Sequence, residues 1–126
     1  MQTQSLPPSL LNLAPTRRAF IRVMLYIYDN EKGSEIYLWP VRVARMYYML
    51  FWPFSSMPKV IPPIMAYQFQ YYLAQLAREF GFRVTSTSKR KFVVVVDLKK
   101  IRRLTRDEFI SVLMKVTEVG GSEGEE

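Results

Sequence analysis

The chain contains neither cysteine nor histidine. The absence of cysteine excludes disulfides and thiol nucleophiles, and the absence of both residue types excludes Cys/His zinc sites and imidazole-based acid–base catalysis. The carboxylates are not clustered, so we expect no metal and no cofactor. Zero cysteines are typical of a reducing cytoplasm, and only two asparagines are typical of a thermophilic host.

Long hydrophobic runs without charge are also missing. The most apolar window, Ile36 to Phe54, contains Arg42 and Arg45 near its middle and is interrupted by two prolines, which argues against a transmembrane span. The N-terminus lacks an early basic region, and prolines break its apolar patch, so it is not a secretory signal. We expect a soluble, cytoplasmic protein with no membrane partner.

Length and composition indicate one domain. With 126 residues, 49% of them hydrophobic, the chain has enough apolar side chains for one core and too few for two. We expect a flexible N-terminal arm over residues 1–14, the domain over 15–118, and a disordered, acidic, glycine-rich tail over 119–126.

Positive charge is concentrated in one segment. The net charge is +7, but between Arg78 and Arg106 ten Lys or Arg residues face two acidic residues, so this segment alone has a charge of +8. Such a concentration indicates a polyanionic partner.

Apolar periodicity predicts four helices. Side chains repeat at spacings of three and four over Thr16–Asn30, Val41–Trp52, Ile64–Phe80 and Thr105–Glu118. Prolines stand at the start of the first three helices, and the last begins with the capping-box spacing from Thr105 to Glu108. The apolar faces are Phe20, Val23, Met24 and Ile27, expected as a buried stripe; Val43, Met46, Tyr47 and Leu50; Phe69, Tyr72, Leu73, Leu76, Ala77 and Phe80; and Phe109, Val112, Leu113 and Val116.

Three strands are predicted between these helices. Glu35–Trp39 is short, and Phe82–Thr87 and Lys91–Asp97 are close enough to pair as a hairpin with a basic tip. In the valine run, Val94 and Val96 are expected to face the helices, whereas Val93 and Val95 need other cover, which the last helix would supply. The following stretch, Leu98 to Leu104, is either a phosphate-binding patch or a solvated linker.

This order of elements resembles the winged helix-turn-helix family over residues 15–118. The resemblance implies an α+β fold with a three-helix core, a short strand, a β-hairpin wing, and a C-terminal helix of the kind many members use to dimerise. It implies a DNA-binding transcriptional regulator that acts on double-stranded DNA as a homodimer. The composition also resembles that of small proteins from viruses of hyperthermophilic archaea, which would place the protein in the host cytoplasm.

The resemblance also implies which residues contact DNA. The second helix of the pair, residues 64–80, would lie in the major groove, and the basic wing, residues 88–91, would meet phosphates. A second patch would follow the hairpin. The implied contacts are Lys59, Tyr67, Gln68, Tyr71, Gln75 and Arg78 near or on the groove helix; Lys89, Arg90 and Lys91 in the wing; and Lys99, Lys100, Arg102 and Arg103 in the second patch.

Other interpretations remain open. The first three turns of the groove helix contain no Lys or Arg, so Tyr67 and Tyr71 would instead cover a neighbour or a dimer partner. The basic tip would then only protect an edge strand from aggregation. The aromatic stretch Met46 to Phe54 favours a protein-interaction module that does not bind nucleic acid. A third interpretation, binding of single-stranded DNA or RNA by stacking of its bases on tyrosines, ranks lower.

Enzyme activity is not expected. Asp107 and Glu108 stand at a helix start, where carboxylates complement the helix dipole. Asp29, Glu31 and Glu35 flank a turn with no partner group that would tune them. We therefore predict no catalytic residue and no small-molecule substrate.

Overall fold

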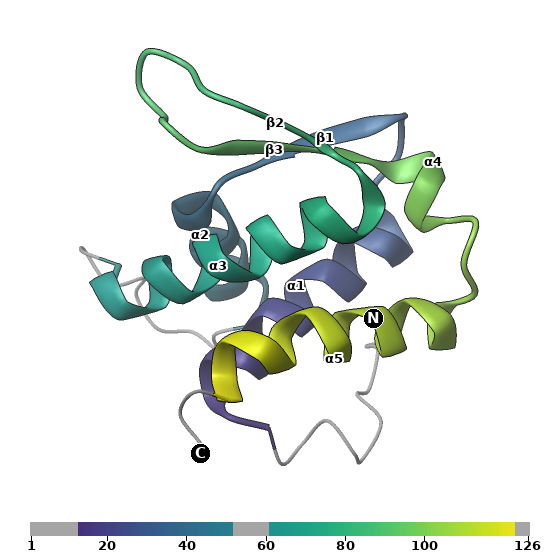
Figure 1. The fold of residues 1–126 in the computed structure, drawn as a ribbon, viewed down its shortest axis with the longest axis horizontal. Helices are drawn as coiled ribbons and strands as arrows, with labels where there is room; N and C mark the ends of the chain where they lie inside the picture. The colour runs from purple at the N-terminus through teal and green to yellow at the C-terminus, as the bar shows by residue number, and fades with distance from the viewer. Residues whose placement is uncertain (1–12, 52–60, 123–126) are drawn as a thin grey trace.

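The protein has an α+β fold. The computed structural model describes residues 13–51 and 61–122, which form five helices and a three-stranded antiparallel sheet. Helices gather beneath one face of the sheet, and a hairpin projects at one end (Figure 1). In chain order the elements are α1 (Pro15–Asn30), β1 (Glu35–Leu38), α2 (Pro40–Phe51), α3 (Pro63–Phe80), β2 (Arg83–Thr85), β3 (Val93–Asp97), α4 (Leu98–Ile101) and α5 (Arg106–Ser122).

The core is built around α1, which contacts α2, α3 and α5. The predicted stripe of α1, from Phe20 to Ile27, is fully buried. Phe20 meets Phe69 and Tyr72 of α3 at ring-centroid distances of 5.8 and 5.2 Å. The predicted apolar set of α3 is buried except for Phe80, which is half-buried against the core. The helix ends where expected, at Gly81 in the left-handed conformation.

The sheet has the strand order β1-β3-β2, so β3 lies in the middle. Tyr37 and Arg83 both pair with Val95, and Val84 pairs with Val94, which confirms the predicted hairpin with shorter strands. All four valines of β3 are at most 5% exposed. The expectation that the last helix covers Val93 and Val95 is wrong, because α5 lies beyond the other helices from the sheet (Figure 1). In the sheet, Val95 lies between Tyr37 and Arg83, and Val93 pairs with Thr85.

The C-terminal part differs from the sequence-based expectation in two ways. The stretch after β3 begins with the short helix α4, which was not predicted and which Asp97 caps by accepting hydrogen bonds from the amides of Lys99 and Lys100. Helix α5 continues to Ser122, into the segment expected to be a disordered tail. Of its predicted apolar face, Phe109, Leu113 and Val116 are buried within this chain, and Val112 is half-buried against the core.

In α2, Val43 is buried as predicted and Met46 and Tyr47 are half-buried, but Leu50 is 40% exposed. The predicted apolar face of α2 is therefore buried only in part, and Leu50 lies outside the core. In the last turn of α2 it is Phe51 that packs on α1, with its ring 6.4 Å from that of Tyr26 and 5.3 Å from the guanidinium carbon of Arg22.

We expect Gly81→Ala to lower the free energy of unfolding by about 1 kcal/mol, because its φ of 73° is unfavourable for a residue with a Cβ. The added Cβ would meet only Lys100 Nζ, at 3.7 Å, an ordinary contact. Gly81→Asn should lower the free energy of unfolding less than Gly81→Ala does, since asparagine tolerates the left-handed conformation better. Urea denaturation measures both, and equal stability of Gly81→Ala and the unmodified protein would contradict the prediction.

Candidate nucleic-acid interface

The hairpin tip is a small, exposed basic turn. The Thr87 amide donates to the Arg90 carbonyl at 2.6 Å, and the Arg90 amide donates to Thr87 Oγ1 at 2.9 Å. This turn closes the hairpin and leaves Lys89, Arg90 and Lys91 exposed. Residues 86–92 include no carboxylate, so the local positive charge is not balanced within the tip.

Arg90 does not point freely into solvent but lies over Trp39. Its guanidinium carbon is 4.8 Å from the centroid of the indole ring, and that of Arg42 is 5.5 Å from the same centroid. Trp39 follows β1 directly, and continuing the register of Leu38 with Val94 places Trp39 beside Val93. The Arg42 guanidinium also donates to the Tyr37 carbonyl at 2.7 Å.

Sequence reasoning missed Trp39 and Arg42. They lie about 50 positions from the tip in the chain, and only the pairing of β1 with β3 brings them to it. The alternation of β1 was the available signal: Ile36 and Leu38 are buried, so Tyr37 and Trp39 belong to the outer face of the sheet.

Helix α3 presents a polar and aromatic stripe opposite its buried face. Tyr67 is 71% exposed, and Arg78 is also exposed. The half-buried Tyr71 and Gln75 lie between them and are linked to Arg78: the Gln75 amide donates to Tyr71 Oη at 2.8 Å, and Arg78 donates to Gln75 Oε1 at 3.2 Å. The predicted groove residues of α3 thus share one side of the helix.

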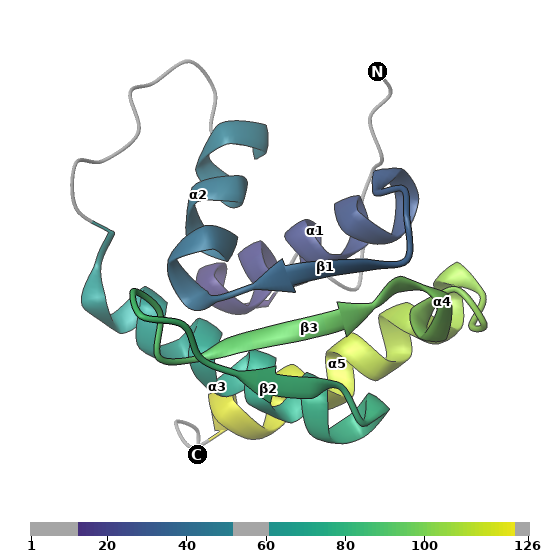
Figure 2. The ribbon, with the colours of Figure 1, turned by 90° about the horizontal axis from the view of Figure 1, so that it is seen from above.

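Gln68 differs from Gln75 in that no hydrogen bond joins it to another described residue, which leaves its amide available to a ligand. Gln70, which the prediction omitted, is exposed as well. The tip of the hairpin and the N-terminal half of α3 lie at the same end of the molecule in both views (Figures 1 and 2). The predicted contact Lys59 lies outside the described residues.

The second predicted patch lies at the other end of the sheet, beside α4 (Figure 2). Two of its four cations bind backbone carbonyls at helix C-termini, where positive charge is favourable. Lys100 Nζ donates to the Phe80 carbonyl at the end of α3, at 3.2 Å. Arg102 donates to carbonyls at the end of α1, those of Ile27, Tyr28 and Glu31. Lys99 and Arg103 remain exposed.

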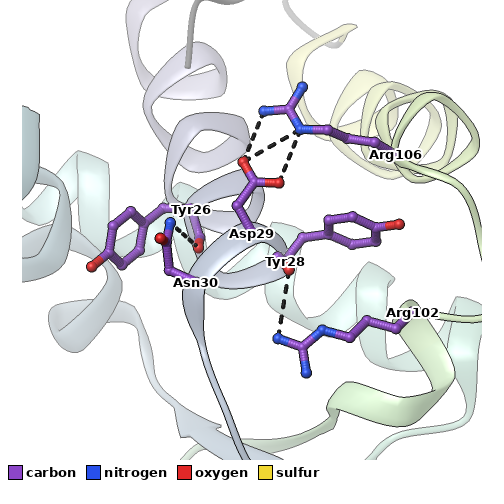
Figure 3. Close-up of polar contacts among 6 residues, drawn as sticks. All are labelled: Tyr26, Tyr28, Asp29, Asn30, Arg102 and Arg106. Atoms are coloured by element: carbon purple, nitrogen blue, oxygen red, sulfur yellow. Dashed lines mark hydrogen bonds and ion pairs between the residues drawn. The ribbon is translucent and has the colours of Figure 1, made fainter. Parts of the chain in front are cut away.

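The acidic residues near this end have structural partners. Arg106 forms an ion pair with Asp29 at 3.0 Å, so the expectation that Asp29 has no partner is wrong (Figure 3). The hydrogen bond to Asp29 raises the pKa of Arg106, although burial opposes this shift. Glu108 and Thr105 form the predicted capping box, with reciprocal hydrogen bonds of 2.8 and 3.1 Å.

Two other kinds of site were sought in the part of the chain that the structure describes. No three acidic residues there are grouped so that they could hold a metal ion. None of the described helices has the length and apolarity needed to cross a membrane.

We expect Arg102→Met to destabilise the fold by about 1 kcal/mol, because it removes a charged donor from the carbonyls that end α1. The midpoint of thermal unfolding should fall by about 4 °C. Arg103→Met is the matched control, since it removes the same charge one position along from an exposed side chain. Calorimetry measures both, and equal midpoints for the two variants would show that Arg102 has no capping role.

No protein-family model, curated protein or solved structure matches this chain. A function must therefore be inferred from the chemistry of its own residues. Two features at one end of the molecule are available for this: the basic hairpin tip and the exposed stripe of α3.

Proposed function

We propose that the chain is a small winged helix-turn-helix protein that binds duplex DNA and regulates transcription. The order α1-β1-α2-α3-β2-β3 and the strand order β1-β3-β2 support this proposal. In this interpretation α2 and α3 form the helix-turn-helix pair, and the hairpin of β2 and β3 is the wing.

The observation that supports DNA binding most directly is the composition and exposure of the hairpin tip. Three consecutive cations are exposed on a turn without a carboxylate. Each phosphate that such a cation neutralises releases condensed counterions, which favours binding to any DNA sequence. Protection of an edge strand explains fewer charges than these, because β2, the strand beside the tip, has only three residues.

Helix α3 would supply the contacts to bases. Glutamine can pair with adenine through two hydrogen bonds in the major groove, and Tyr67 can reach a phosphate or a base. The stripe contains one cation, Arg78, so it would contribute little to counterion release. The tip would therefore supply affinity, and the helix would supply sequence preference.

We expect duplex binding to weaken steeply with salt, with a log–log slope of about −4.5 if about five phosphates are contacted per subunit. Reversing all three charges of the tip to Glu should reduce the magnitude of the slope by at least ~2.7, because three contacts are lost. Fluorescence anisotropy of a labelled random-sequence duplex measures the slope.

Single charge reversals provide the control. Lys32→Glu changes an exposed lysine in the connection between α1 and β1, at the end of the sheet opposite to the tip (Figure 2). It should affect binding much less than Lys89→Glu, which makes the same change at the tip. A flat salt response, or equal effects of the two reversals, would contradict the proposed interface.

We expect Gln68→Ala to change the sequence preference and leave the salt slope unchanged, since a neutral amide releases no counterion. Selection of bound sequences from a random library measures the preference. Gln70→Ala is the control: Gln70 is exposed but lies about 100° around the helix from Tyr71. If the unmodified protein and Gln68→Ala select identical sequences, Gln68 does not contact bases specifically.

A second candidate function, a protein-interaction module without nucleic acid, is favoured by exposed apolar side chains. Met49 is 73% exposed near the end of α2, and Ile64 is 64% exposed at the start of α3. A homodimer would bury the same side chains and agree with the leading proposal. Sedimentation equilibrium distinguishes these cases: a monomer that fails to bind duplex at low salt would favour the second candidate.

A further inference from the structure

We propose that Trp39, Arg42 and Arg90 form a phosphate-binding site at the junction of β1 and α2, which holds a phosphodiester of the DNA backbone. The inference rests on the proposed DNA binding and extends it. It adds Arg42, a residue outside the hairpin and the groove helix, to the contacts, and it assigns Arg90 a defined partner surface instead of free solvent.

The geometry brings two guanidinium groups to one indole ring. Their central carbons lie 4.8 and 5.5 Å from the ring centroid, so the two charges are separated by no more than the sum of these distances. Both lie within the range in which the face of an indole attracts a cation. Arg42 is held further by its hydrogen bond to the Tyr37 carbonyl.

The electrostatics of this cluster favour an anion. The two ion pairs among the described residues are Arg106 with Asp29 and Lys115 with Glu79, and neither involves Arg42 or Arg90. The two guanidinium charges near one ring repel each other. A phosphate shared between them would remove this repulsion, because guanidinium groups match phosphate oxygens in planar, paired hydrogen bonds.

The position of the site in the fold agrees with a contact to the DNA backbone. The site lies where the hairpin of β2 and β3 passes the start of α2, at the end of the sheet from which the tip projects (Figure 2). Duplex DNA that reached Lys89 and Lys91 would pass next to Arg90. A merely structural role, in which Trp39 anchors the tip and no ligand enters, is the competing account that the experiment separates.

The experiment compares Arg42→Gln with Arg45→Gln, an exposed arginine of the same helix that has no contact with Trp39 among the described interactions. Anisotropy of a labelled duplex gives affinity and salt slope. Arg42→Gln should reduce the magnitude of the slope by about 0.9, which corresponds to roughly eightfold weaker binding at 0.1 M salt. Arg45→Gln should leave both nearly unchanged.

A second measurement observes the site directly. The chain has two tryptophans, so Trp52→Phe leaves Trp39 as the single fluorescent reporter. Its emission should change on addition of duplex, and Arg42→Gln should reduce this change. The slope comparison is made in the unmodified background and does not depend on how Trp52→Phe folds.

The outcomes separate this inference from the function on which it rests. If the duplex binds, but Arg42→Gln keeps the full slope and Trp39 emission does not change, the site is wrong and DNA binding stands. Equal losses for Arg42→Gln and Arg45→Gln would also overturn it, because they indicate a general charge effect. If anisotropy shows no duplex binding even at low salt, the proposed function fails and this inference fails with it.

Discussion

The pairing of β1 with the central strand β3 is the constraint on which the rest of the structure depends. It makes β3 a central strand, with β2 on its other edge, so that Tyr37 and Arg83 flank Val95 on the outer face while Val94 and Val96 join the helical core. Because β3 is fixed in this way, the hairpin leaves the sheet in one direction, toward the end where α3 begins (Figures 1 and 2). The same pairing brings Trp39 beneath Arg90.

The positive charge of the chain has two physical uses that its sequence does not separate. Lys100 and Arg102 donate to carbonyls at the C-terminal ends of α3 and α1, where a cation also complements the helix dipole. Cations of the tip have no such partner among the described residues, apart from the ring under Arg90. The basic segment is therefore divided between opposite ends of the sheet, and its total charge overstates what one ligand would meet.

Much of the fold was predictable, because helical periodicity, proline starts and the glycine stop after Phe80 are local signals. The position of α4 was not predicted, since its cap, Asp97, looks in sequence like the end of a strand. Long-range features were also missed: the ion pair of Asp29 with Arg106, and the stacking of Arg42 and Arg90 on Trp39, join residues far apart in the chain. The pattern of a single sequence shows which face of a helix or strand is apolar, but it does not show which faces of different elements contact each other.

The scarcity of cations on α3 has a consequence for how the two parts of the proposed interface would divide recognition. Contacts from Tyr67 and Gln68 release few counterions, so their contribution to binding would change little with salt, whereas that of the tip would fall steeply. Raising the salt concentration would then remove affinity shared by all sequences and leave the discrimination by α3 in place. In such a protein the ratio of affinities for two sequences should stay nearly constant while the total affinity declines, whereas base contacts made by a basic groove helix would themselves weaken with salt.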